Sequence, residues 1–211
     1  MILNLISLNE KYELNITGII HVGGHYGEEH NTYKKLNIND IIYFEPLPHN
    51  FNVLVNKTNH ESIYIMEALG SIVEEKEMFV EYNNQSQSSS LLEPKKHLIQ
   101  YPHIKFNEKI KVKVNLLDNF NFNDKFNFIN MDVQGYELEV LKGSKNTLNN
   151  IDYIISEVNR DELYSGCPMV EELDVFLDSY GFIRVETNWA GGTWGDAFYI
   201  KKKHLKTSKN I

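Results

Sequence analysis

The stretch Gly18-Ile-Ile-His-Val-Gly-Gly-His-Tyr-Gly27 constrains the fold of this chain more than any other. Three of residues 19–22 are apolar and favour a strand. Gly23, Gly24 and Gly27 allow the backbone to turn sharply and to approach a ligand closely. A helix after such a turn presents free N–H groups and the positive end of its dipole. The pattern predicts a buried strand, then a glycine turn (residues 23–27) that holds a polar or anionic nucleotide-like ligand, then a helix.

Apolar segments with strand and helix periodicity alternate along the rest of the chain, as is typical of an α/β fold. Strands are predicted over 40–45, 62–66, 126–131, 152–156, 182–186 and 197–200, with two half-exposed strands over 77–82 and 111–115. Helices are predicted over 26–36, after Pro48, over 136–148 and over 170–180. This order indicates a mostly parallel sheet with helices on both faces, in which ligands bind at the carboxyl ends of strands. Gly23, Glu45, Asp132 and Glu157 all come at such predicted ends.

Composition limits the class of protein. A chain of 211 residues suits one domain, here residues 1–211, with an N-terminal strap over 1–16 and a basic tail over 203–211. The net charge of −8 argues against broad binding to nucleic acid. One cysteine, Cys167, leaves no internal disulfide and favours a reducing compartment, so we expect the cytoplasm, or the host cytoplasm for a viral protein. No apolar run is long enough to span a membrane.

Two segments leave a structural and a functional interpretation open. Residues 83–90, here called the polar loop, form either a mobile surface loop or a lid over a ligand. Trp189 and Trp194 bracket a glycine-rich loop and either stack against a sugar or cap the core of the sheet. Ser89 and its serine neighbours in the polar loop could donate hydrogen bonds to the hydroxyl groups of a substrate.

Several strings of this sequence occur together in one known family. They are His-Val-Gly-Gly-His-Tyr-Gly27, Tyr-Phe-Glu-Pro-Leu-Pro-His-Asn-Phe51, Val-Asn-Leu-Leu-Asp118, Asn-Met-Asp-Val-Gln-Gly-Tyr-Glu-Leu-Glu-Val-Leu-Lys-Gly143, Ile-Ser-Glu-Val158 and Gly-Asp-Ala-Phe-Tyr199. In this combination the chain resembles the FkbM-like S-adenosylmethionine-dependent methyltransferases over residues 17–202. The resemblance implies a Rossmann-like class I methyltransferase fold. Its seven-stranded sheet is mostly parallel, with an antiparallel last strand.

The resemblance also implies S-adenosylmethionine as cofactor and O-methylation of a small molecule or glycan. Gly23, Gly24 and Gly27 would surround the methionine part of the cofactor. The remaining implied contacts are Glu45 and Pro46 at the ribose, Glu67 and Ala68 near the adenine, and Asp132 and Gln134 at the sulfonium end. His21 stands where the family usually has Asp, and His25 where it usually has Asn. His21 can contact the amino group of the cofactor only as a neutral acceptor.

Methyl transfer to a hydroxyl needs a group that takes the proton of the acceptor. Asp132 and Glu157, here called the acidic pair, could act as base and orienting group, or hold a divalent metal together. The structural alternatives are a helix cap for Asp132 and a solvated strand end for Glu157. His25 is a further candidate base, as are His49 and His103, because histidine titrates near neutral pH. No close His and Asp spacing indicates a metal site.

These observations favour an O-methyltransferase that acts on a sugar hydroxyl of a glycan or nucleotide-sugar. An RNA cap or ribose methyltransferase would need a basic track to the site, which the charge of −8 disfavours. A non-enzymatic module of the same fold is the third alternative, supported by His21 in place of Asp. We expect a small-molecule or glycan partner, with no nucleic acid and no membrane; the oligomeric state is not indicated by the sequence.

Overall fold

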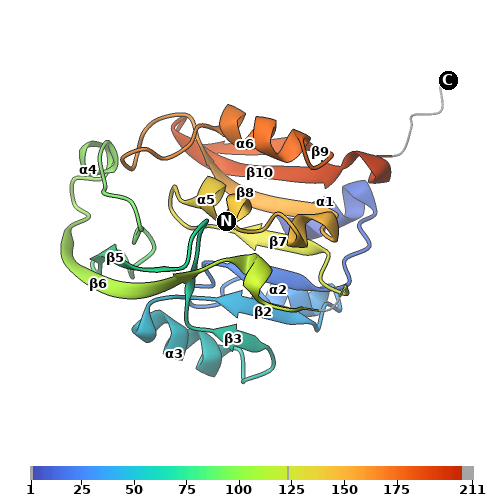
Figure 1. Ribbon diagram of the computed structural model, residues 1–211, viewed down its shortest axis with the longest axis horizontal. Helices are drawn as coiled ribbons and strands as arrows, with labels where there is room; N and C mark the ends of the chain where they lie inside the picture. Colours follow the sequence, from blue (N-terminus) through green and yellow to red (C-terminus); the bar gives the residue numbers. More distant parts are fainter. Residues whose placement is uncertain (1, 123, 206–211) are drawn as a thin grey trace.

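A computed structural model describes residues 2–122 and 124–205, and a seven-stranded sheet forms its centre (Figure 1). The strands follow one another across the sheet as β3 (Ile63–Ile65), β2 (Ile41–Phe44), β1 (Ile19–Val22), β7 (Phe128–Met131), β8 (Tyr153–Asn159), β10 (Trp194–Lys201) and β9 (Phe182–Ala190). The first five pair in parallel, and β10 runs antiparallel to both β8 and β9. The structure confirms the mostly parallel sheet with an antiparallel last strand.

Helices cover both faces of this sheet, because alternate residues of each strand point to opposite faces. One face packs against α1 (Leu5–Tyr12), α2 (His30–Lys35) and α3 (Pro48–Lys57), through Leu5, Tyr33 and Leu54 among others. The other face packs against α5 (Glu137–Lys142) and α6 (Val170–Asp178), through Val140 and Leu173 among others. Ile19 and Ile20 are neighbours in β1 and belong to different cores.

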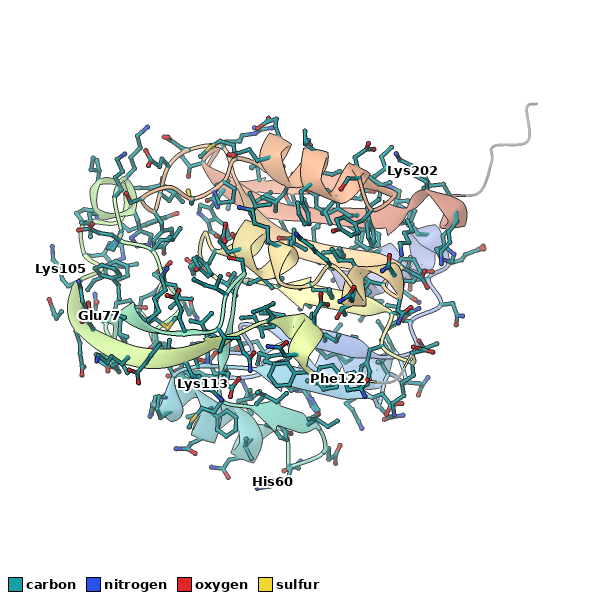
Figure 2. The ribbon with its side chains drawn as sticks, in the orientation of Figure 1. His60, Glu77, Lys105, Lys113, Phe122 and Lys202 are labelled. Carbon is teal, nitrogen blue, oxygen red and sulfur yellow. The ribbon has the colours of Figure 1, made fainter. Side chains whose placement is uncertain are left out.

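A second, small sheet lies at one end of the molecule, at the left in Figure 1. It pairs β4 (Ala68–Leu69) with β6 (Phe106–Asn115) and β6 with β5 (Glu74–Glu81), and α4 (His97–Gln100) lies beside it. Figure 2 shows Glu77 and Lys113 among its charged side chains. The small sheet meets α5 where Gly70 approaches Gly143; a Cβ on Gly143 would lie 1.9 Å from the carbonyl oxygen of Gly70.

Several elements differ in extent from the sequence prediction. The helix expected over 26–36 covers only 30–35, because Gly27 takes a φ of +71°, outside the helical region. The helix expected over 136–148 ends at Lys142, and a 3₁₀ turn follows over Thr147–Asn149. Strands β9 and β10 are longer than expected because they form one continuous hairpin. Glu157 was expected at a strand end, but β8 continues to Asn159, where it pairs with Trp194.

The two chain ends pack on the large sheet as far as the structure describes them. The backbone N–H groups of Ile2 and Leu3 both donate to the carboxylate of Asp196. At the other end Lys203 and His204 each contact Asp152 at 2.8 Å. Residues 206–211 of the predicted basic tail lie outside the described residues. Within the described residues, each helix falls short of the length and apolar character that a membrane crossing requires.

Candidate active site

A cavity of about 660 Å³ opens at the carboxyl ends of the parallel strands, where the fold class places ligands. Its lining includes Gly23 after β1, Glu45 after β2 and Asp132 after β7. The small sheet contributes Ala68 and Met78 to one wall. The volume lies within the range of pockets that hold small molecules and cofactors.

The glycine turn shapes one side of the cavity. The N–H groups of Gly23 and Gly24 both donate to the carbonyl oxygen of Phe44, at 3.0 and 2.9 Å. Gly23 has a φ of +80°, and a Cβ there would lie 2.0 Å from the carbonyl oxygen of Asp132. Only glycine therefore fits this position. Gly24 and Gly27 do not line the cavity; they face Tyr43, Leu54 and Thr58.

Glu45 connects the loops that follow β1 and β2. Its Oε2 accepts the backbone N–H of His25, and its Oε1 accepts that of Leu47, both at 2.9 Å. The side chain is buried, and burial raises the pKa of Glu45 to about 7. Each carboxylate oxygen has room for a second hydrogen bond. The residue can therefore accept hydrogen bonds from two neighbouring hydroxyl groups of a ligand, such as those of a ribose.

The other residues expected near the ribose and the adenine also line the cavity. They are Pro46, Glu67 and Ala68. Glu67 forms an ion pair with Lys113 and accepts a hydrogen bond from Asn115 at 2.9 Å. Burial alone would raise the pKa of Glu67, but the bonds to Lys113 and Asn115 outweigh it and lower that pKa. Glu67 is thus a fixed carboxylate at the edge of this part of the cavity.

The acidic pair meets at the cavity through Gln134. The amide Nε2 of Gln134 donates to Asp132 Oδ1 and to Glu157 Oε2, both at 2.7 Å, and its Oε1 accepts the hydroxyl of Tyr164 at 2.8 Å. Burial and the nearby Asp132 raise the pKa of Glu157 well above its usual value. Glu157 therefore holds a proton more tightly than an exposed glutamate does. The structure brings Asp132, Gln134 and Glu157 together, and it adds Tyr164, which the sequence analysis missed.

Glu137 holds the loop that carries this pair. Its Oε1 accepts the backbone N–H groups of Val133 and Gly135, both at 3.1 Å. The side chain is fully buried, and burial raises its pKa to about 7. Both bonds fix the turn in which Gln134 takes a positive φ of 55°. Glu137 therefore orients Gln134, although it does not line the cavity itself.

His21 lines the cavity as a neutral imidazole. Burial lowers its pKa. The amide Nδ2 of Asn130 donates to the hydroxyl oxygen of Tyr33, and that hydroxyl contacts His21 Nδ1 at 3.1 Å. We assign the hydroxyl proton of Tyr33 to the contact with Nδ1. The ring proton of His21 then resides on Nε2. His21 is thus a hydrogen-bond donor at Nε2, which suits a carboxylate better than the amino group that the Asp of the family would contact.

His25 connects the glycine turn to the polar loop. Its Nδ1 contacts Glu28 Oε1 at 3.0 Å, and its Nε2 contacts the carbonyl oxygen of Gln85 at 2.7 Å. Burial alone would lower the pKa of His25, but the hydrogen bonds to Glu28 and Gln85 outweigh it and raise that pKa. Both partners only accept hydrogen bonds, so the doubly protonated ring satisfies both. With both nitrogens engaged, His25 holds the polar loop in the observed position.

The polar loop lies over the cavity and lines it with Ser89 and four other residues, which are Asn84, Ser86, Gln87 and Ser88. The carboxylate of Glu81 accepts the N–H groups of Asn84 and Ser88, at 2.6 and 3.2 Å. Ser89 Oγ accepts the N–H of Glu81 at 3.3 Å. This position favours the lid interpretation over that of a mobile surface loop.

The two tryptophans occupy different environments. Trp194 lines the cavity, and its Nε1 donates to the hydroxyl oxygen of Tyr101 at 2.9 Å. Trp189 does not line the cavity; it packs against the core on the α6 side, with the guanidinium of Arg160 3.7 Å from its ring centroid. His97, which was not among the predicted site residues, lines the cavity as Trp194 does.

Acidic side chains predominate among the ionisable residues that line the cavity. Six carboxylic side chains line it, namely those of Glu28, Glu29, Glu45, Glu67, Asp132 and Glu157. Within the described part of the chain, the lining contains no lysine or arginine. Among residues 2–122 and 124–205, no group of three or more His, Cys, Asp or Glu side chains is arranged to hold a metal ion. The cavity therefore suits a ligand that is cationic or neutral where it meets these carboxyl groups.

Comparison with solved structures relates this fold to known enzymes. The N-methyltransferase NodS from Bradyrhizobium japonicum superposes with a TM-score of 0.55, at 10% identity over 93% of this chain and 92% of that one. The magnesium protoporphyrin IX methyltransferase from Synechocystis PCC 6803, solved with bound S-adenosylmethionine, gives a TM-score of 0.53 at 7% identity, over 94% and 78% of the two chains. At such identities the likeness establishes the class I methyltransferase fold alone.

Comparison of sequences is more specific. The 2-O-methyltransferase NoeI of Sinorhizobium fredii is 37% identical over 82 residues, which cover 37% of this chain and 34% of that protein. The match thus spans about a third of the length of this curated relative. The family described as Methyltransferase FkbM domain matches residues 21–184, which include the glycine turn, Glu45 and the acidic pair. This chain therefore belongs to the FkbM methyltransferase domain family.

Proposed function

We propose that this protein transfers a methyl group from S-adenosylmethionine to a hydroxyl oxygen of a sugar. The observation that supports this proposal best is the meeting of Gly23, Glu45 and the acidic pair around one cavity. The name of the relative NoeI, a 2-O-methyltransferase, agrees with an oxygen acceptor.

The cofactor would lie along the carboxyl ends of β1, β2 and β7. Glu45 would accept hydrogen bonds from its ribose hydroxyls, and the His21 Nε2–H would donate to its carboxylate. Gly23 lines the cavity where the methionine part of the cofactor would lie. When bound, the cofactor supplies a methyl group on a positively charged sulfur. The carboxyl groups of the lining favour that charge.

The acidic pair would take the proton of the acceptor hydroxyl. The raised pKa of Glu157 favours its protonated form, which leaves the other member of the pair to act as base. We assign the base to Asp132, which lies after β7, and the orienting role to Glu157. Gln134 fixes both groups at 2.7 Å and is itself held by Tyr164. A positioned base contributes about 10²–10⁴-fold to such a step.

Incubation with methyl-labelled S-adenosylmethionine tests the proposal. The acceptor panel contains methyl glycosides, neutral oligosaccharides, UDP-glucose and short RNA. We expect label in a carbohydrate, with the methyl group located on oxygen by mass spectrometry and NMR. Asp132→Asn should lower the rate by about 10²-fold or more. Glu77→Gln, an exposed carboxylate on β5, should not. Label in RNA alone, or in no carbohydrate, would overturn the proposal.

A further inference from the structure

One group of side chains that line the cavity is not used by the cofactor or the acidic pair in the proposed reaction. It consists of His97, Tyr101 and Trp194, here called the α4 wall. His97 is only 3% exposed, and its Nδ1 has no hydrogen-bond partner in the described part of the chain. Burial and the nearby His103 lower the pKa of His97 to about 4. His97 is therefore a neutral imidazole. Because Nδ1 is buried, a ligand in the cavity meets one ring nitrogen, which acts as either donor or acceptor.

Tyr101 complements His97 because, among the described residues of the wall, none accepts its hydroxyl proton. Its oxygen accepts the indole N–H of Trp194 and the amide N–H of Gln100, both at 2.9 Å. A phenol oxygen has two acceptor positions and one proton, so the proton remains available to a ligand. The ring centroids of Tyr101 and His97 are 5.0 Å apart. The hydroxyl donor and the neutral imidazole are thus carried by neighbouring side chains of the wall.

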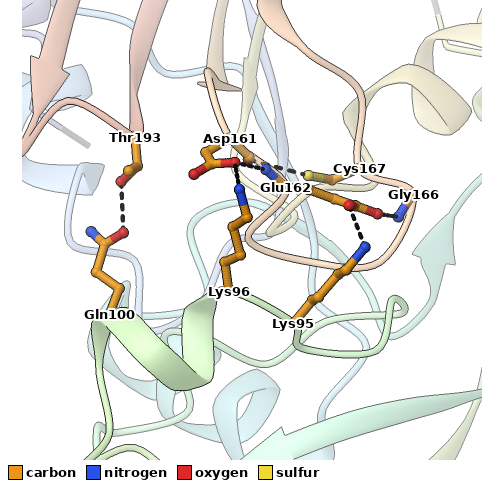
Figure 3. A network of polar contacts seen from close by, with 8 residues as sticks. All are labelled: Lys95, Lys96, Gln100, Asp161, Glu162, Gly166, Cys167 and Thr193. Carbon is orange, nitrogen blue, oxygen red and sulfur yellow. Dashed lines mark hydrogen bonds and ion pairs between the residues drawn. The ribbon is translucent and has the colours of Figure 1, made fainter.

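The α4 wall is held from outside the cavity. Figure 3 shows the contacts: Lys96 pairs with Asp161 at 2.5 Å, and Thr193 donates to Gln100 at 2.9 Å. Lys95 pairs with Glu162 in the same network. These bonds tie α4 to the segment after β8 and to the β9–β10 hairpin. A site held in this way is preorganised, so less free energy is lost when a ligand orders it.

The charges around the wall restrict the ligand. The described residues that line the cavity include six carboxylic side chains and neither lysine nor arginine. A phosphate or carboxylate group at the wall would meet repulsion from these carboxyl groups, and the cationic ring of His25 already has both nitrogens engaged by Glu28 and Gln85. Hydroxyl groups need only the neutral donors and acceptors that His97 and Tyr101 provide.

We infer that the α4 wall is the acceptor subsite and that it binds an uncharged sugar rather than a sugar phosphate, nucleotide-sugar or RNA. The inference rests on the proposed function, since it names the substrate class of that reaction. His97 and Tyr101 hydrogen-bond to neighbouring hydroxyls of the sugar. Trp194 fixes the hydroxyl oxygen of Tyr101 and adds apolar surface.

A binding experiment tests the subsite without turnover. The full chain, loaded with S-adenosylhomocysteine, is titrated by ligand-observed NMR with methyl glycosides of glucose, galactose, rhamnose and N-acetylglucosamine, and with glucose 6-phosphate and UDP-glucose. At least one neutral glycoside should bind, and the phosphorylated sugars should bind at least tenfold more weakly, about the effect of one lost charge interaction. Tyr101→Phe and His97→Phe should each weaken glycoside binding about fivefold or more, because each removes one hydrogen bond. Binding of S-adenosylhomocysteine should not change.

The control is Tyr82→Phe, an exposed tyrosine outside the wall. Equal or tighter binding of the phosphorylated sugars would overturn the inference. Glycoside binding that is unaffected by Tyr101→Phe and His97→Phe, or no glycoside binding at all, would also overturn it. Glycoside binding through the wall without any methyl transfer would support the subsite while refuting the proposed function. Methyl transfer to a sugar that is independent of both side chains would support the proposed function while refuting the subsite.

Discussion

Replacement of Glu45 tests the cofactor site most directly, because this side chain joins the loops after β1 and β2. Each carboxylate oxygen accepts one backbone N–H at 2.9 Å and keeps one position for a ribose hydroxyl. A hydrogen bond to a charged group contributes about 1.5–3 kcal/mol, so two contribute about 3–6 kcal/mol. Since about 1.4 kcal/mol corresponds to a factor of ten, Glu45→Ala should weaken S-adenosylmethionine binding by about 10²–10⁴-fold.

The pH dependence of binding provides a second measure of the same contact. Burial raises the pKa of Glu45 to about 7. The ionised carboxylate accepts both hydroxyl hydrogen bonds, so cofactor binding favours deprotonation. The dissociation constant should therefore fall about tenfold between about pH 6 and about pH 8 and level off above. Glu45→Ala should remove this component of the pH dependence.

Isothermal titration calorimetry measures both effects, and a double-mutant cycle separates the ribose contact from a disturbed loop. The cycle compares S-adenosylhomocysteine with its 2′,3′-dideoxy analogue in the native protein and in Glu45→Ala. The analogue should lose affinity for the native protein and little for the variant. Glu77→Ala is the matched control on the small sheet. Unchanged cofactor affinity in Glu45→Ala, or equal losses in both proteins, would refute the role given to Glu45.

Three further predictions concern the surroundings of the cofactor. Gly23→Ala should lower the free energy of unfolding by about 3 kcal/mol or more, because its Cβ would meet the Asp132 carbonyl at 2.0 Å. Gly181→Ala, with the same φ of +80° and open space, should cost about 1 kcal/mol, so equal losses in chemical denaturation would contradict the steric argument. The raised pKa of His25 means that its bonds to Glu28 and to Gln85 of the polar loop are both made below about pH 6.5, and that one of the two is lost as pH rises through the folded-state pKa. Hydrogen exchange of the loop, corrected for intrinsic rates, should quicken there in the native protein but not in His25→Ala. NMR of ¹⁵N-labelled protein should show His21 neutral above about pH 6.5 with its proton on Nε2; a proton on Nδ1 would exclude the proposed donor role.

The part of the site that could be predicted lies at strand ends. Gly23, Glu45 and Asp132 each follow a short apolar strand, and parallel strands bring such positions to one edge of the sheet. The prediction that β8 ends at Glu157 was wrong, since the strand continues for two more residues. The side chain of Glu157 nevertheless lines the cavity. The local hydrophobic pattern therefore predicts where β1, β2 and β7 end, and the parallel topology brings those ends together.

The part that could not be predicted comes from irregular segments. His97 and Tyr101 lie on and just after a helix of four residues, too short for a periodic signal. Tyr164 lies in a connection without regular structure. Their positions depend on long-range contacts, such as those of α4 with Asp161 and of Tyr164 with Gln134. Such contacts follow from the packed fold and leave no local pattern in the sequence.

The close approach of Gly70 and Gly143 makes the breadth of the cavity sensitive to residues that do not line it. An added methyl group on Gly143 would act as a wedge between α5 and β4, because the carbonyl of Gly70 occupies that space. Ala68 and Leu69 directly precede Gly70 and do line the cavity. A change of one carbon atom, remote from any bound molecule, would thus displace the wall on which a purine base is expected to rest.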